Sequence, residues 1–353
     1  SGQDTSQSEF YSAPPEGFKA LCSANFDDPT VKAHENFNTI TYSGGDDTDT
    51  GVGFQPDMTW IKQRNSPVRR HHIQDSLRTA GRSLFPNATT SEEVSSNYVT
   101  SFDSDGFSLG ASGEVNGSSK TYVAWNWLSA TSANSGNEKH NSSSGWSIIK
   151  WTGDSDAGGD GYSEQTVSHS LGVAPEMIIA KARSDSNLSS YGYERDWCVY
   201  HKDLTSGYFV KLNETDSEIE HDGALFSAIG TSSLDFGNDT YDNQYLNYAE
   251  YYSGTGEDYV AYLFASVDGV TKVGSYTGNA SSDGPTVYCG FRPAFVMVKR
   301  VSNSDGWVMH DNARDPDNGI QLLLQADDTA VESGSGTDSM DFLATGFKLK
   351  VAS

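Results

Sequence analysis

The feature that most constrains the fold is a threefold internal repeat. Three segments share a Gly, an apolar residue, a variable residue, Pro and an apolar run that ends in Lys: GVGFQPDMTWIKQR (51–64), SLGVAPEMIIAKAR (170–183) and YCGFRPAFVMVKRV (288–301). In each segment Pro closes a turn and the run predicts a buried strand, with Lys62, Lys181 or Lys299 emerging at its end. Such self-similarity constrains the architecture more than any single residue does.

Further signals recur in a fixed order around this motif. A strand with Tyr or Trp that enters a Gly turn precedes it, and a short strand, a Leu-containing strand with acidic residues and an aromatic–Gly hairpin follow it. A closing strand, YVAWNW (122–127) or YVAYLF (259–264), ends the first two units, and the third unit reaches Ser353 without one. Short strands separated by turns are typical of β-sandwiches and jelly rolls.

We therefore expect an all-β chain of three tandem β-sandwich or jelly-roll-like repeats with an extended N-terminal arm. Its 35 Gly, 18 Tyr and 16 Phe favour strands and turns over helices. The expected units are an N-terminal tail and arm (1–37), repeat 1 (38–129), a Ser-, Asn- and Gly-rich linker (130–145), repeat 2 (146–266) and repeat 3 (272–353). An alternative stays open, in which the three units pack into one pseudo-symmetric body.

The charge of the chain disfavours one class of partner. A formal net charge of −25 argues against nucleic-acid binding, because Lys and Arg that neutralise phosphates supply most of that affinity. Residues 146–266 hold 20 acids against 6 Lys and Arg, so cations should collect on repeat 2. No apolar run approaches the roughly 20 residues that cross a bilayer, so membrane insertion is not expected.

No catalytic residue is predicted. The sequence has no G-x-S-x-G, HExxH or P-loop motif, and its scattered acids define no carboxylate pair. Cys22, Cys198 and Cys289 are widely separated and lack CxxC spacing, which predicts buried free thiols rather than a disulfide framework or zinc site. We therefore expect a protein that is not an enzyme.

Five stretches carry a resemblance to a known group of proteins: APPEGFKALCSAN (13–25), the GF-x-P-x(3)-WIK-type strand (53–62), the hairpin SFDSDGF (101–107), YVAWNW (122–127) and the run from GSYTGN to VYCGFRPAFVMVKR (274–300). Together they resemble a repeat domain of tail-fibre-like and virion structural proteins of marine bacteriophages, particularly those of cyanobacterial hosts. The resemblance implies a structural protein at the virion surface, a tail fibre or appendage that presents its units for attachment to host glycans. It supplies no catalytic residues.

Other roles remain open beside this one. The chain could be a subunit of an extracellular adhesive filament, a capsid decoration protein or a polysaccharide-degrading tailspike. Expected partners are other virion proteins or further copies of the chain. A trimer is favoured by analogy, because symmetric repetition buries faces that a thinly cored monomer would expose.

One candidate metal site lies in repeat 2. Asp154, Asp156 and Asp160 alternate on a Gly-bent loop, an arrangement suited to the oxygen ligands of Ca²⁺. The loop departs from an EF-hand at Gly158 and Gln165, where that motif has Asp or Asn and Glu. A solvated turn is the alternative, and Ca²⁺ is the one cofactor considered.

One candidate glycan site lies in the longest insertion of repeat 2. Tyr241, Asp242, Asn243, Tyr245 and Tyr248 combine aromatic faces that can stack on sugars with polar groups that can bind hydroxyls. The alternative is that these tyrosines cover the sandwich or form a contact between subunits.

The only basic cluster lies in repeat 1. Arg64, Arg69, Arg70 and Arg78, together with nearby His and Arg residues, could pair with the acidic unit of a neighbouring subunit or bind an anionic polysaccharide. Contact between subunits is the preferred hypothesis.

Overall fold

The structure, a computed structural model, is almost entirely antiparallel β-sheet, which confirms the all-β prediction. It describes residues 31–45, 48–129, 136–153, 164–184, 195–220, 225–236, 246–247, 256–334 and 339–350. One 3-10 turn, η3 (Ala33–Glu35), precedes the first strand. Among these residues no helix has the length and apolar character that a membrane crossing requires.

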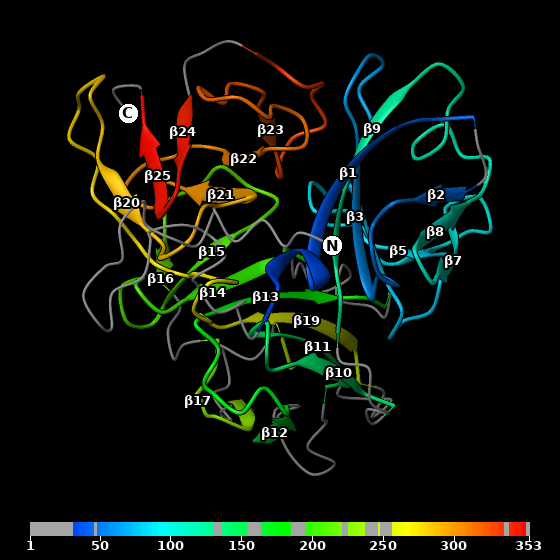
Figure 1. Cartoon of the computed structure of the whole chain (residues 1–353). Coiled ribbons are helices and arrows are strands. Elements are labelled where there is room, and N and C mark those ends of the chain that lie inside the picture. The colour runs from blue at the N-terminus through cyan, green and yellow to red at the C-terminus, as the bar shows by residue number, and fades with distance from the viewer. Residues whose placement is uncertain are drawn as a thin grey trace, which may run out of the picture.

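The strands form three lobes arranged around a common centre (Figure 1). Lobe 1 holds β1 (Phe37–Ser43), β2 (Thr48–Thr50), β3 (Met58–Gln63), β4 (His72–Asp75), β5 (Arg82–Ser83), β6 (Glu93–Val94), β7 (Val99–Asp103), β8 (Gly106–Leu109) and β9 (Thr121–Trp127). Lobe 2 holds β10 (Glu138–Asn141), β11 (Trp146–Thr152), β12 (Gln165–Ser168), β13 (Met177–Ala182), β14 (Cys198–His201), β15 (Tyr208–Lys211), β16 (Ile219–Glu220), β17 (Ala228–Ile229), β18 (Ser233–Phe236) and β19 (Asp258–Phe264). Lobe 3 holds β20 (Thr286–Tyr288), β21 (Phe295–Lys299), β22 (Trp307–Asp311), β23 (Leu324–Gln325), β24 (Met340–Leu343) and β25 (Gly346–Leu349).

Each lobe is a small sandwich of an inner and an outer sheet. The inner sheets have the orders β1-β9-β3-β4, β10-β11-β19-β13-β14-β15-β16 and β21-β22-β23. The outer sheets, β2-β8-β7, β12-β18-β17 and β20-β25-β24, are three-stranded hairpin assemblies. A separate apolar core lies between the two sheets of each lobe.

A fourth and largest core lies where the three inner sheets meet. It contains buried residues of every lobe, among them Trp60 and Trp125 from lobe 1, Trp197 from lobe 2, and Trp307 and Met309 from lobe 3. The three units therefore form one body with a pseudo-threefold arrangement, the alternative that the sequence left open.

The central strands of the inner sheets of lobes 1 and 2, β3, β9, β13 and β19, are buried on both faces because they lie between two cores. Side chains alternate across a strand, so Tyr122 and Ala124 of β9 enter the outer core of lobe 1 while Val123 and Trp125 enter the central core. All six residues of β3 are buried for the same reason. This double burial explains why the repeated motif is a continuous apolar run rather than an alternating one.

The lysines that end the first two repeated runs are buried, which corrects the expectation that they emerge at the surface, whereas Lys299 is half-buried. Lys62 and Lys181 are fully buried. Each amino group binds one carbonyl of its own lobe and one of a neighbouring lobe. The pairs of acceptors are Arg69 and Thr329 for Lys62, Arg195 and Thr89 for Lys181, and Asp305 and Thr215 for Lys299. A buried ammonium requires such partners, because its desolvation is otherwise expensive.

Backbone bonds close the three lobes into a ring. At each junction the amide of a glutamate donates to a carbonyl two residues after the lysine that ends the repeated run of the next lobe. The bonds are Glu92 to Arg183 (2.9 Å), Glu218 to Val301 (3.0 Å) and Glu332 to Arg64 (2.8 Å). Lobe 1 thus binds lobe 2, lobe 2 binds lobe 3, and lobe 3 binds lobe 1.

A second set of bonds closes the ring through aromatic side chains. Trp197 Nε1 donates to the carbonyl of Phe85 (2.8 Å) and Trp307 Nε1 to that of Lys211 (2.8 Å). At the equivalent position His71 Nε2 lies 2.9 Å from the carbonyl of Gln325. Trp60 Nε1 donates to His71 Nδ1 (2.9 Å), so the proton of the neutral imidazole must lie on Nε2. Burial lowers the pKa of His71 well below its ordinary value, in agreement with a neutral ring.

Two of the three cysteines lie in the described part of the chain. Cys198 is a buried free thiol, as expected, whereas Cys289 is only half-buried. Burial raises the pKa of the Cys289 thiol above its ordinary value.

Candidate functional site

Two of the candidate sites lie outside the described residues. These are the calcium loop with Asp154, Asp156 and Asp160, and the glycan-binding set Tyr241, Asp242, Asn243, Tyr245 and Tyr248. Within the described ranges, no group of three or more His, Cys, Asp or Glu side chains is placed to hold a metal ion.

The basic cluster of lobe 1 is described, and the side chains of Arg64, Arg70 and Arg78 have partners within the chain. Arg64 forms a bidentate pair with Glu332 of lobe 3, Arg70 pairs with Glu93 and Glu114, and the carbonyl of Arg69 accepts a bond from Lys62. Arg78 is only 2% exposed and therefore cannot contact a neighbouring subunit, which corrects that part of the prediction. A subunit contact through the other three stays a prediction.

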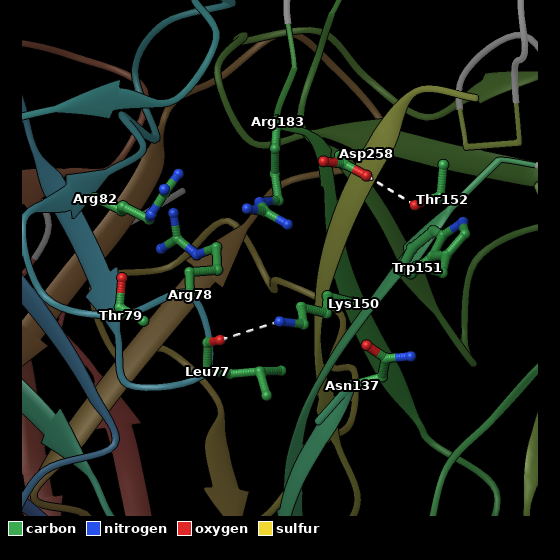
Figure 2. Close-up of a pocket in the computed structure, with 10 residues that line it drawn as sticks. All are labelled: Leu77, Arg78, Thr79, Arg82, Asn137, Lys150, Trp151, Thr152, Arg183 and Asp258. Atoms are coloured by element: carbon green, nitrogen blue, oxygen red, sulfur yellow. Dashed lines mark hydrogen bonds between the residues drawn. The ribbon is translucent and has the colours of Figure 1, made fainter. Parts of the chain in front are cut away.

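A pocket of about 450 Å³ lies at the junction of lobes 1 and 2. Four cationic side chains line it, and Figure 2 shows three guanidinium groups gathered on one wall with a lysine on the other. The lining residues are Leu77, Arg78, Thr79 and Arg82 from lobe 1, and Asn137, Lys150, Trp151, Thr152, Arg183 and Asp258 from the lobe 2 side. This concentration of positive charge is unusual on a chain with a net charge of −25.

A buried ion network forms the floor of the pocket. Arg78 donates to Asp75 (2.6 Å) and Glu92 (2.9 Å), and Glu92 also pairs with Arg82 and Arg183. Burial opposes the ionisation of Glu92, but Arg78 and Arg183 outweigh it and lower its pKa to about 2. Burial likewise disfavours the charge of Arg78, and Asp75 more than compensates, so its pKa is raised. Glu92 and Arg78 therefore stay charged at neutral pH.

Lys150 and Arg82 are the cations with capacity left for a ligand. Lys150 Nζ has one long bond, 3.4 Å to the carbonyl of Leu77. The Arg82 side chain is 40% exposed and pairs with Glu92 through Nη1. An ammonium has three donors and a guanidinium five, so both can bind an incoming anion while keeping these contacts.

The ion pairs around Glu92 recur at a second junction between lobes. At the junction of lobes 3 and 1, Glu332 binds Arg314 and Arg64 just as Glu92 binds Arg78 and Arg183. That pattern serves lobe packing, since it occurs twice.

The other two cations of the pocket have no such counterpart. The repeat places Thr41 and Ser275 where lobe 2 has Lys150, and the strand register places Leu322 and Tyr208 where lobe 1 has Arg82. The pocket thus adds two cations to a packing motif at one junction only.

The chemistry of the lining suits an anionic group with hydroxyls around it. Asp258 is the one carboxylate among the lining residues, and it accepts a bond from Thr152 Oγ1 (2.8 Å). Thr79 and Asn137 supply further polar groups. Lys150 and Arg183 were not among the residues selected from sequence, and the mismatch of Lys150 with Thr41 and Ser275 in the repeat is the signal that could have identified the first of them.

A family model described as a domain of unknown function (DUF7483) matches residues 32–353. No curated protein and no solved structure matches the chain. The family match extends over all three lobes.

Proposed function

The chain belongs to the DUF7483 domain family, and we propose that it is a structural and adhesive module of a bacteriophage particle that holds an anionic surface polysaccharide. The resemblance to phage virion domains motivates the setting. The observation that carries the binding role is the pocket between lobes 1 and 2, where Arg82 and Lys150 add positive charge that the packing of the lobes does not need.

The overall acidity of the chain does not oppose this role. At physiological ionic strength, charges more than about 8 Å apart are largely screened, so a local cluster decides whether a single carboxylate or sulfate binds. A nucleic acid would need a continuous basic track instead. A sugar residue with one charge fits the pocket better than a long polyanion does.

The lining favours binding over hydrolysis. Glycoside hydrolysis uses two carboxyl groups that flank the bond, and Asp258 is the single carboxylate among the residues that line this pocket. We therefore propose recognition of the sugar without cleavage at this site.

The internal ring bears on the expected trimer. The central core already buries the inner faces of three repeats within one chain, so thin cores give no reason for trimer formation. A trimer remains a proposal that rests on analogy with phage fibres.

The binding role can be tested by titrating the purified chain with a uronic-acid polysaccharide and a sulfated polysaccharide, with neutral dextran as the reference ligand. We expect binding to at least one acidic polymer that weakens as salt is raised. The double variant R82Q/K150Q should bind at least tenfold more weakly. K202Q is the matched control, because Lys202 pairs with Glu176 outside the pocket lining and its loss should leave affinity unchanged.

Two results would sink the proposal. One is equal binding of dextran and the acidic polymers. The other is an R82Q/K150Q variant that binds as tightly as the unmodified chain.

A further inference from the structure

Among the described residues, lobe 3 has no counterpart of a strand that the other two lobes have. In lobe 1, β9 lies between β1 and β3, and in lobe 2, β19 lies between β11 and β13. The corresponding strand of lobe 3, β21, pairs with β22 on one side and with no described strand on the other. Its free edge presents unpaired backbone donors and acceptors, which favour the addition of a strand.

The segment that should lie on the far side of this gap is among the described residues. Residues 271–277 correspond to β1 and β11, and Tyr276 meets Phe347 edge-on at 6.1 Å, just as Tyr42 meets Phe107 at 6.1 Å. Tyr42 also stacks on Tyr122 of β9 at 5.0 Å. Among the described residues Tyr276 has no corresponding second ring, and a strand in the position of β9 would supply one.

The apolar side chains beside the gap are incompletely buried. Ile61 of β3 and Ala180 of β13 are fully buried, whereas their counterpart in β21, Val298, is only half-buried, as is Met297 beside it. A strand in the gap would bury both, which is a favourable term of about 25 cal/mol per Å² of apolar area removed from water.

The lobe that faces the gap indicates which side chain the missing strand carries. Trp125 of β9 donates to Asp311 (3.0 Å), the partner of Arg314, and Tyr262 of β19 donates to Asp75 (2.7 Å), the partner of Arg78. Each of these two aromatic side chains thus has an N–H or O–H group that donates to the aspartate of the neighbouring lobe.

At the third junction the equivalent positions hold His201 and Leu204 instead of an Asp–Arg pair. The strand that fills the gap should therefore present an apolar residue without a polar handle at this point.

We propose that the gap is filled by this chain's own segment Gly17–Ser23, which lies outside the described residues. Its Phe18-x-Ala20-Leu21 matches Tyr-Val-Ala-Trp of β9 and Tyr-Val-Ala-Tyr of β19, with Leu21 at the position that faces Leu204. Lys19 replaces the valine and enters a central face that already accommodates buried lysines.

The path of the chain agrees with this assignment. The strand must run antiparallel to β21, as β19 does to β13, so its last residue lies beside Phe295. The ring of Phe37, which begins β1, is 5.8 Å from that of Phe295. Thirteen residues connect Ser23 to Phe37, between the 18 that connect β9 to β11 and the 6 that connect β19 to residue 271. The docked segment would add the strand beside β21 and complete the inner sheet of lobe 3.

A disulfide test uses the native thiol of the segment. The register of β19 on β13 pairs Leu263 with Ile178, which places Cys22 directly opposite Val296. In most of the V296C protein we expect mild oxidation to link Cys22 to the introduced thiol within one molecule, as detected by peptide mass spectrometry. M297C is the matched control, because its side chain points to the opposite face, and it should give at least tenfold less disulfide.

Deletion of residues 1–30 gives a second readout that needs no substitution in β21. Hydrogen exchange at β21 should be at least tenfold faster in the deletion variant, with β3 and β13 unchanged. Equal exchange in both proteins overturns the proposal whatever V296C does. A V296C disulfide that joins Cys22 of one molecule to the introduced thiol of another also overturns it, because the strand would then come from a second copy.

Discussion

The burial of Lys181 makes the free energy of unfolding depend on pH. Burial lowers the pKa of Lys181 from 10.5 to about 7, so between pH 7 and 10 the unfolded chain binds a proton that the folded chain does not. The contribution of Lys181 to the free energy of unfolding therefore rises with pH in that window.

We expect the difference between the unmodified chain and K181M, measured by urea denaturation, to grow by about 2–4 kcal/mol from pH 7 to 10. The exposed Lys202 should give no such trend in K202M. A difference that is flat with pH would show that Lys181 titrates normally.

Glu92 is an acid whose charged form the fold stabilises, whereas the fold disfavours the charged form of Lys181. Its folded pKa of about 2 lies below the ordinary 4.5, so its stabilisation is complete above about pH 4.5 and is lost as the pH falls to 2. E92Q breaks a buried network and should cost about 3 kcal/mol at pH 7, with the two proteins converging near pH 2.

The equivalent Glu218 is the control for this measurement. Among the described residues its carboxylate accepts bonds only from exposed Thr205, so E218Q should change stability by less than about 1 kcal/mol. Equal losses in E92Q and E218Q would contradict the assigned role of the arginines.

The burial of Lys62 and Lys181 could not be predicted from the local sequence. The repeat located Lys62 and Lys181, but a charged side chain after an apolar run predicts exposure, and the carbonyls that bind these lysines lie 267 and 92 residues away. Long-range partners of this kind leave no local signal. The pocket cations are different, because comparing Lys150 with its counterparts in the repeat does reveal that lobe 2 departs there.

At the scale of strands the sequence was more informative. Each predicted run after Pro became an inner strand, β3, β13 or β21, and both predicted closing strands became β9 and β19. These runs are locally encoded, because a strand between two cores must be apolar on both faces. Their pairing order is not, since it depends on contacts between distant segments.

The outer sheet of lobe 3 depends on one close backbone approach. A Cβ at Gly346 would lie 1.9 Å from the carbonyl oxygen of Val287 in β20, and the residue has φ +158°. G346A should therefore separate β20 from β25 and destabilise the protein by about 1–3 kcal/mol.

Gly334 is the matched control, because a Cβ there meets only the side chain of Leu322 at 3.6 Å. Hydrogen exchange should report the loss locally, with faster exchange in β20 and β25. Unchanged protection of β20 in G346A would contradict the close approach.

For the whole molecule, the central core and the closed ring predict that the three lobes unfold together. Trp197 and Trp307 each donate an indole N–H to a carbonyl of a different lobe. W197F and W307F remove those donors and leave a carbonyl unpaired, which should cost about 1–3 kcal/mol in each case. In calorimetry both variants should keep a single transition whose van't Hoff and calorimetric enthalpies agree, shifted to lower temperature by similar amounts. Independent tandem domains would instead show one shifted transition beside unshifted ones. The loss of one bond between separately folding units could not destabilise all three of them.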